Sequence, residues 1–511
     1  MAVIEPIEKD AEGRRGYRVT NPASLEVIGE FRVETADDLR VRVQRARKAQ
    51  AAWAKRSVKE RAEIIQNALD LLVERKEEII DTIVADTGRG RTETLLMEII
   101  PSADSMAWYA RRAPGMLKDR KVGTQTLLKA KRMVVTHRPL GVVGVIAPWN
   151  GPFVLSINPS VPALLAGNAV IIKPSEITPF SGGLVEQLFL DAGLPEGLLQ
   201  VARGDGETGA ALIEAGIDKL SFTGSTATGR KVAESAGRNL VQYSLELGGK
   251  DASIVCADAD LDRAARGVLY GAMFNTGQFC CATERVYVVR EVADAFIDKV
   301  VEHAKALRQG DDGEQDVSAM IWPNQIPIIE AQIEDALKKG ARVLVGGKRN
   351  TALKGEAFEP TVLVDVNHSM RVMQEENFGP ILPIMVVEDE DEALALANDS
   401  DFGLSGTVWT KDNKKGLEIA KQMETGSICV NESSLTYGIH RAPFGGVKQS
   451  GVGYVHGDEG ILHFTRQVPV IFDRLGLKEE QNWYPLTEKK REDMGKFLGF
   501  FYGSRIFRKL A

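Results

Sequence analysis

The sequence predicts an α/β protein built on two doubly wound parallel sheets. Short apolar segments with the composition of strands alternate with helical segments along the chain, and this alternation is typical of parallel sheets covered by helices. The first set of predicted strands spans 133–137, 141–147, 169–173, 199–202, 220–223 and 241–245. The second set spans 253–256, 286–289, 342–345, 361–364, 382–387 and 407–410. A chain of 511 residues is also too long for a single core, so more than one domain is expected.

Two helices are predicted ahead of the first strand set. One begins near 35–38 with an acidic first turn. The other begins at Ser57 and Glu60, which have the spacing of a capping box. Apolar residues then recur at helical spacing, at Ala62, Ile65, Leu69, Leu72 and Ile79.

The composition excludes several classes of protein. The chain is 44% hydrophobic and 26% charged, as is usual for a globular protein. Its net charge of −7 argues against a nucleic-acid partner, because phosphate contacts need a basic surface. The acidic start lacks the features of a signal peptide, and no apolar run is long enough to span a bilayer. We therefore expect a cytoplasmic location.

The four cysteines are too few and too unevenly spaced for a disulfide framework or a zinc site, so we expect reduced thiols and no metal; they are Cys256, Cys280, Cys281 and Cys429. Cys280 follows Gly277 in a loop between a predicted helix and a predicted strand. In such a loop, backbone N–H groups can stabilise a reactive thiolate. The alternative is a structural cysteine, because free cysteines usually pack in the core.

Two further residues have the properties of catalytic groups. Glu246 lies in an apolar run directly before two glycines, and apolar surroundings raise the pKa of a carboxyl group toward the range of a general base. Asn150 follows a strand on a rigid turn, where its amide could donate to a developing oxyanion. The simpler alternatives are a surface acid for Glu246 and a turn former for Asn150.

An anion site is predicted where a strand leads into a helix at Gly224 and Ser225. The chain has no GxGxxG fingerprint, but the N-terminus of a helix binds anions through its free N–H groups. A plain turn with a helix cap is the alternative. Lys173 and Glu176 also follow a strand, and ligands of doubly wound sheets bind at the carboxyl ends of the strands.

These segments and their order resemble the aldehyde dehydrogenase superfamily over about residues 20 to 470. The motifs that carry the resemblance are Pro148-Trp149-Asn150, Lys173-Pro174-Ser175-Glu176, Phe222-Thr223-Gly224-Ser225, Leu245-Glu246-Leu247-Gly248-Gly249, Gly277-Gln278-Phe279-Cys280 and Glu375-Glu376-Asn377-Phe378-Gly379-Pro380. The resemblance implies oxidation of a small-molecule aldehyde with NAD, and with NADP as the second choice. It makes Cys280 the nucleophile, Glu246 the base that activates water and Asn150 the oxyanion donor.

The resemblance also assigns the cofactor contacts. Ser225, next to Gly224, would contact a phosphate, and Lys173 and Glu176 would hold the adenosine ribose. A carboxylate at Glu176 favours NAD, because it accepts from a 2′-hydroxyl and repels a 2′-phosphate. Glu376 would hold the nicotinamide ribose. The remaining cofactor-binding residues that the resemblance implies are Pro148, Trp149 and Phe378.

The resemblance divides the chain as well. It implies a Rossmann-like dinucleotide-binding domain from residues 1–118 and 139–247 and a catalytic domain from residues 248–446. Residues 119–138 and 461–475 would form bridging strands that pair across subunits of a homodimer or homotetramer.

Several features bear on the substrate. Pro159 stands ten residues after Trp149, where many relatives carry a lysine, and this proline resembles the branch that includes fatty and aromatic aldehyde dehydrogenases. With Phe279 and Phe153, this favours a medium- or long-chain aliphatic or an aromatic aldehyde. His440 and Arg441 could instead receive a carboxylate, as in succinic semialdehyde. A coenzyme A-acylating relative is a further alternative, although it would not need Glu246.

The tail over 476–511 differs in composition from the rest. Its last part, from Glu488, has seven lysines and arginines against three acidic residues. Apolar residues recur at helical spacing at Met494, Phe497, Leu498 and Phe501. This pattern predicts an amphipathic basic helix, either in peripheral contact with the inner surface of a membrane or docked on a neighbouring subunit.

Overall fold

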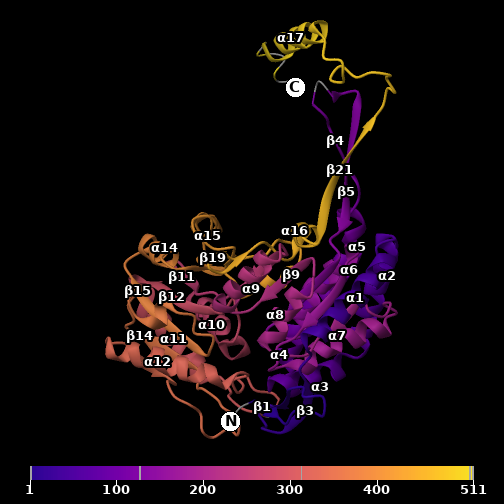
Figure 1. The fold of residues 1–511 in the computed structure, drawn as a ribbon. Coiled ribbons are helices and arrows are strands. Elements are labelled where there is room, and N and C mark those ends of the chain that lie inside the picture. Colours follow the sequence, from indigo (N-terminus) through magenta and orange to yellow (C-terminus); the bar gives the residue numbers. More distant parts are fainter. Residues whose placement is uncertain (1–2, 126–127, 312, 504, 506–507, 509–511) are drawn as a thin grey trace.

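The computed structural model describes residues 3–125, 128–311, 313–503, 505 and 508, and it confirms the α/β architecture. Two helix-covered sheets form the body of the molecule, and a narrow arm of strands rises from the body and carries the C-terminal helix at its far end (Figure 1). Within the described ranges, no helix combines the length and the apolar composition that crossing a membrane requires.

The first sheet has six strands in the order β20-β10-β9-β6-β7-β8. Five pair in parallel, and β20 joins β10 in the antiparallel sense. The strands are β6 (Val142–Ile146), β7 (Ala169–Lys173), β8 (Leu199–Val201), β9 (Lys219–Thr223), β10 (Gln242–Glu246) and β20 (Gly451–Val452). The connecting helices are α6 (Val154–Leu165), α7 (Pro179–Asp191), α8 (Gly206–Glu214) and α9 (Thr226–Arg238).

The second sheet has seven strands in the order β13-β14-β15-β12-β11-β17-β18, parallel except for β13. Its strands are β11 (Asp251–Val255), β12 (Thr283–Val289), β13 (Arg342–Val345), β14 (Thr361–Val364), β15 (Ile381–Val387), β17 (Ser405–Trp409) and β18 (Ser427–Val430). Ile254 and Val255 belong to different apolar clusters, because neighbouring side chains of a strand point to opposite faces. Both faces of the sheet are therefore buried.

The helices of this part of the chain cover those two faces (Figure 1). The helical segments of this part of the chain, including short ones that do not cover the sheet, are α10 (Leu261–Met273), η3 (Phe274–Gly277), η4 (Arg290–Val292), α11 (Ala293–Lys305), η5 (Pro323–Gln325), α12 (Ile326–Lys338), α13 (Arg371–Gln374), α14 (Glu390–Asn398), α15 (Asn413–Ala420) and η6 (Thr436–Gly438). A small ribbon pairs β16 (Phe402–Gly403) with β19 (Val447–Lys448).

The N-terminal part packs against the first sheet. It begins with an antiparallel sheet of β1 (Ile4–Ile7), β2 (Gly16–Thr20) and β3 (Val27–Arg32). The helices that follow are α1 (Ala36–Trp53), α2 (Val58–Glu74), α3 (Lys76–Thr87), α4 (Arg91–Thr94), the π-helix η1 (Leu95–Ile99) and α5 (Ile100–Met116). The predicted capping box of Ser57 and Glu60 is present at the start of α2.

The arm consists of β4 (Arg120–Val122), β5 (Lys131–Pro139) and β21 (Thr465–Asp473). All nine residues of β21 pair with β5, from Thr465 opposite Pro139 to Asp473 opposite Lys131. The predicted strand at 133–137 thus lies in the arm and not in the first sheet. The predicted strand start at 461 is wrong: Ile461 ends up in the short helix α16 (Gly457–Leu462), which buries it completely in the first core.

The predicted tail helix is present as α17 (Glu488–Gly503), although residues 504, 506–507 and 509–511 lie outside the described part of the chain. None of its described residues is buried. Phe497 and Phe501 contact each other with ring centroids 4.5 Å apart, and Leu498 is 60% exposed. The predicted apolar face therefore exists and lies open on the arm.

Candidate active site

Cys280 lies at the amino-terminal edge of the second sheet, in the loop between α10 and β12. The loop turns through three consecutive left-handed residues, Asn275, Thr276 and Gly277. A Cβ at Gly277 would come within 2.1 Å of the carbonyl oxygen of Gly379, so only glycine fits there. Cys280, three residues after this turn, is partly exposed.

The neighbouring thiol is in a different environment. Cys281 is buried, and its Sγ lies 3.9 Å from the Sγ of Cys280. The contact with Cys280, together with burial, holds the pKa of the Cys281 thiol well above its ordinary value. The partly exposed Cys280 is thus the accessible thiol of the pair.

Glu246 is the last residue of β10, at the carboxyl end of the first sheet. Its main-chain oxygen accepts from the N–H of Gly224, whereas neither side-chain oxygen has a hydrogen-bond partner among the described residues. Burial, and to a lesser degree the nearby Cys280, raises the pKa of Glu246 well above its ordinary value. A buried carboxyl group without partners, close to a thiol, can take a proton from a water molecule beside that thiol.

Asn150 reaches the cysteine loop from the other side. It follows β6 and is 4% exposed, and its Nδ2 donates to the carbonyl oxygen of Gln278 at 3.1 Å. The structure therefore brings three residues together from both sheets. Cys280 comes from the loop before β12 of the second sheet, whereas Glu246 and Asn150 come from the carboxyl ends of β10 and β6 in the first.

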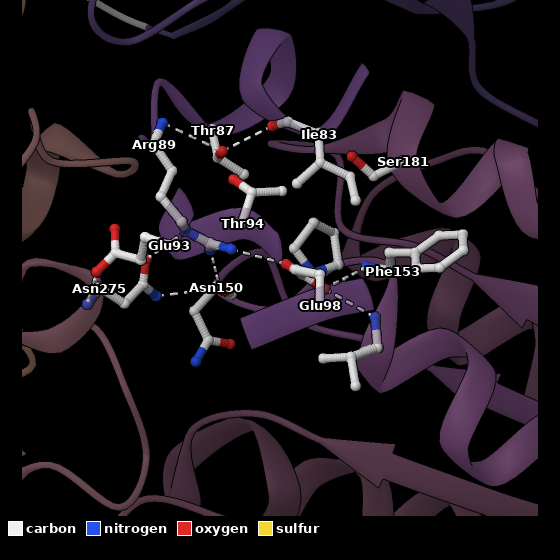
Figure 2. A network of polar contacts seen from close by, with 12 residues as sticks. Ile83, Thr87, Arg89, Glu93, Thr94, Glu98, Asn150, Phe153, Ser181 and Asn275 are labelled. Atoms are coloured by element: carbon white, nitrogen blue, oxygen red, sulfur yellow. Dashed lines mark hydrogen bonds and ion pairs between the residues drawn. The ribbon is translucent and has the colours of Figure 1, made fainter. Parts of the chain in front are cut away.

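Arg89 and Glu98, two buried residues that the sequence did not single out, support this arrangement (Figure 2). They form an ion pair at 3.0 Å, and Arg89 also binds Asn275 and the main chain of Asn150. The only local sign was the run Gly88-Arg89-Gly90 directly after a helix. An arginine between two glycines is typical of an exposed turn, so this run did not identify Arg89 as a functional residue.

The first sheet carries one half of the predicted cofactor contacts. Ser225 is the N-cap of α9, and its Oγ accepts from the N–H of Thr228 at 3.3 Å. Lys173 ends β7 and its Nζ lies 3.0 Å from Glu176 Oε2. These groups lie at the carboxyl ends of β7 and β9 or directly after them, as expected for a ligand that crosses that edge of the sheet.

The second half comes from the loop before β15. Glu376 accepts from the N–H of Gly249 at 3.2 Å. The ring of Phe378 packs edge-on against the ring of Trp149, with ring centroids 5.4 Å apart. Pro148, directly before Trp149, is half-buried. This loop is held by Glu284, a buried residue that the sequence did not identify, which accepts from the N–H groups of Asn377 and Phe378.

The residues present fit a dinucleotide. An exposed helix N-terminus suits a phosphate, and the polar side chains of Lys173, Glu176 and Glu376 suit sugar hydroxyls. The aromatic pair of Trp149 and Phe378 lies at the junction of the two sheets, where a flat ring system could be held.

On the remaining side, apolar residues pack around Cys280. The cluster consists of Met97, Phe274, Phe279, Cys281, Ala282, Leu404, Tyr437, Phe444 and Val455. Phe279 thus lies beside the thiol as expected, but Phe153 does not: it is fully buried in the first core, because α6 turns that face toward the sheet.

The two residues considered as carboxylate receptors differ in placement. His440 is completely buried, and its Nε2 lies 3.3 Å from Asn158 Nδ2. Burial lowers the pKa of His440, although Asp104 partly opposes that shift. Arg441 is exposed. A neutral imidazole would be a weak receptor for a carboxylate.

Residues 8–470 match the aldehyde dehydrogenase family. The chain is 42% identical over 484 residues to 4,4'-diapolycopene aldehyde oxidase of a Methylomonas species, covering 94% of this chain and 91% of that protein. It is 41% identical over 472 residues to a putative NADP(+) succinate-semialdehyde dehydrogenase of Mycolicibacterium smegmatis, covering 91% and 90%. A crystal structure of Mycobacterium tuberculosis aldehyde dehydrogenase complexed with NAD+ superimposes with a TM-score of 0.86 at 35% identity, covering 91% of this chain and 96% of that chain.

The chain belongs to the aldehyde dehydrogenase family. It is an enzyme that oxidises aldehydes with NAD(P)+.

Proposed function

We propose that the enzyme converts a medium- or long-chain aliphatic, or an aromatic, aldehyde to the carboxylic acid. The observation that carries this proposal is the packing of apolar side chains around Cys280, next to a buried Glu246 whose side chain has no hydrogen-bond partner in the described part of the chain. The aldehyde carbon would meet the thiol, and its hydrocarbon part would lie among Phe279, Phe444 and Tyr437.

Three residues divide the chemistry. The Cys280 thiolate adds to the aldehyde carbon, and the resulting oxyanion accepts hydrogen bonds from Asn150 Nδ2 and the N–H of Cys280. The dinucleotide, when bound, supplies the acceptor for the hydride that leaves this carbon. After the hydride has left, the oxyanion re-forms the C=O bond, and the carbon, still bonded to Cys280 Sγ, is a thioester. Glu246 takes a proton from water, the water oxygen attacks the thioester carbon, and the C–S bond breaks to release the acid.

An acidic substrate is the second candidate, because the Mycolicibacterium relative is named as a succinate-semialdehyde dehydrogenase. The burial of His440 and the exposure of Arg441 count against it, since neither offers a charged group inside the apolar cluster. The Methylomonas relative, named for an aldehyde of 4,4'-diapolycopene, accords with the apolar choice.

The test is kcat/KM over a panel of aldehydes that includes octanal, benzaldehyde and succinic semialdehyde. We expect values that rise with chain length and are lowest for succinic semialdehyde. If succinic semialdehyde is the best substrate, the acidic alternative replaces this proposal. Product analysis with and without coenzyme A tests the acylating alternative, in which an acyl-coenzyme A would appear in place of the acid.

For the cofactor, we propose a preference for NAD over NADP. Glu176 is 28% exposed beside Lys173, so its carboxylate can accept from a ribose hydroxyl and would repel a 2′-phosphate. We expect kcat/KM to be higher with NAD than with NADP. Glu176→Gln should reduce the ratio of kcat/KM with NAD to kcat/KM with NADP. A wild-type enzyme with a higher kcat/KM for NADP, the cofactor printed in the name of the Mycolicibacterium relative, would contradict this.

We assign dinucleotide binding to residues 1–118 and 139–247, catalysis to residues 248–446, and subunit pairing to the arm of a homodimer or homotetramer. The arm supports the last assignment, because β21 leaves Ile471 60% and Phe472 49% exposed. Light scattering should give a dimer or tetramer, and Ile471→Asp with Phe472→Asp should shift it toward the monomer. A monomeric wild-type enzyme would exclude this role.

We propose that the tail contacts the inner surface of a membrane peripherally. α17 combines basic residues with exposed Leu498, Phe500 and Tyr502, and the linker before it exposes Trp483 and Tyr484. Apolar side chains beside lysine and arginine suit a surface of anionic lipid.

Truncation after Pro485 should abolish co-sedimentation with anionic liposomes at low salt and leave the oxidation of short soluble aldehydes intact. Liposomes of neutral lipid provide the control. If the full-length enzyme ignores anionic liposomes and the truncation instead dissociates the oligomer, α17 is a subunit contact.

A further inference from the structure

Arg89 joins three parts of the active site through one guanidinium group (Figure 2). The side chain is 1% exposed, in the connection between α3 and α4. It donates to Glu98 Oε1 at 3.0 Å and to Asn275 Oδ1 at 2.8 Å, and Nη2 donates to the main-chain oxygen of Asn150 at 2.5 Å. These acceptors lie in η1, in the cysteine loop and in the turn after β6.

Asn275 closes the network around the oxyanion donor. Its Nδ2 donates to the main-chain oxygens of Asn150 at 3.1 Å and of Gln278 at 2.7 Å. Gln278 O also accepts from Asn150 Nδ2. Because a carbonyl oxygen only accepts, it requires the nitrogen end of the Asn150 amide to face the cysteine loop. An NH2 group has two hydrogens, so one remains for an oxyanion.

Glu98 anchors the other end. Its Oε2 accepts from the N–H groups of Phe153 at 3.2 Å and Val154 at 2.8 Å, at the start of α6. The ion pair is therefore buried with hydrogen bonds on both partners, which is the condition under which a buried pair is tolerated. Through it, Arg89 links the Asn150 turn to the rigid start of a core helix.

We propose that Arg89 is a positioning residue of the reaction: it holds the main chain of Asn150, and through Asn275 the cysteine loop, so that the Asn150 amide is aimed at the developing oxyanion. The proposal rests on the role proposed above for Asn150. Lysine cannot replace the arginine here, because an ammonium group lacks the planar fork that serves three acceptors in different directions.

Arg89→Lys should lower kcat by about 10- to 100-fold, because small displacements of a catalytic group have effects of this size, and should leave the Kd for NAD unchanged. The matched control is Arg61→Lys. Arg61 is also buried and also donates to main-chain oxygens, those of Leu165 and Arg56, but it does not contact the active site. It should keep the wild-type kcat.

The decisive measurement repeats Arg89→Lys in an Asn150→Ala background. If Arg89 acts through the Asn150 amide, the second substitution has little further effect on kcat. If Arg89→Lys lowers kcat by the same factor in both backgrounds, or leaves kcat unchanged in the wild-type background, the positioning role is excluded while the oxyanion role stands. Full activity of Asn150→Ala alone would exclude the oxyanion role, and the positioning role with it.

If Arg89→Lys does not fold, a double variant that removes both charges of the ion pair takes its place. Arg89→Gln with Glu98→Gln removes both charges together and avoids leaving one buried charge without its partner. The same comparison in the two Asn150 backgrounds then applies, with the same two outcomes.

Discussion

The wall of the active site and the tail helix use the same kinds of residue in opposite ways. Arg89 and Glu98 are almost completely buried, and their partners come from several segments. In α17, the side chains of Arg491 and Glu488 pair while more than 70% exposed, and no described residue of the helix is buried. Buried charges that are fully hydrogen-bonded fix a geometry, whereas exposed pairs contribute little. The buried pair therefore fixes the geometry of the active site, whereas the exposed pair of α17 fixes little.

The largest effect is expected at the thiol. Cys280→Ser should lower kcat by at least about 10³-fold, because no other group would form the thioester. Cys281→Ser is the matched control and should retain turnover. Steady-state rates and stoichiometric labelling with a thiol reagent measure the two variants. The reverse pattern would assign the nucleophile to Cys281.

Glu246→Gln should come next, with a loss of about 10²- to 10⁴-fold in turnover, the usual range for a general base. One equivalent of reduced cofactor should still form in a rapid burst, because the thioester forms but is not hydrolysed. The kcat of the wild type should rise with pH as Glu246 loses its proton. This rise should be absent from the pH profile of Glu246→Gln. A variant without a burst would move the role of Glu246 to an earlier step.

The raised pKa of Glu246 also links pH to stability. The folded chain keeps this proton to higher pH than the unfolded chain does, so stability decreases as pH rises from the ordinary glutamate value through the raised one. Glu246→Gln has no carboxyl group to titrate and therefore does not show this decrease in stability with pH. Its Tm should exceed that of the wild type more at pH 8 than below about pH 4, where both states are protonated. An equal difference at both pH values would contradict the assigned shift.

A glycine-to-alanine substitution should have opposite effects on stability in the cysteine loop and in α17. Gly277→Ala should destabilise the enzyme by about 1–2 kcal/mol or more, because alanine is strained at a φ of +69° and its Cβ would overlap Gly379 O. A Cβ at Gly495 would meet no atom within 4 Å among the described residues outside its own helix backbone and chain neighbours, so Gly495→Ala should stabilise α17 by up to about 1 kcal/mol. Circular dichroism and thermal unfolding of both variants measure this. Destabilisation by Gly495→Ala would mean that α17 is packed on a partner.

The smallest effect is expected on the surface of the tail. Arg491→Gln breaks an exposed ion pair and should change the free energy of unfolding by no more than about 0.5 kcal/mol. Urea unfolding should show no shift in midpoint beyond error. A change of several kcal/mol would show that the tail is as tightly integrated as the active-site wall.

Local patterns in the sequence were sufficient for much of this molecule. Strands such as β7 and β15 are continuous apolar runs between turns, and the start of α2 depends on side chains three residues apart, so both are readable without the fold. Cys280, Glu246 and Asn150 were identified by their residue type and short flanking motifs. The structure places the three residues at one site, and their catalytic roles are the proposal made above.

Other features depend on contacts between distant segments. Arg89 binds Asn150 and Asn275, which lie 61 and 186 residues away, so no local pattern marks it as anything but a turn residue. Phe153 was expected to help favour an apolar substrate, but it is buried in the first core at the start of α6. Ile461 was predicted in a strand, but it lies in α16 and is buried in the first core. In each case the outcome depends on which side chains share a buried volume, and that is decided only when the chain has folded.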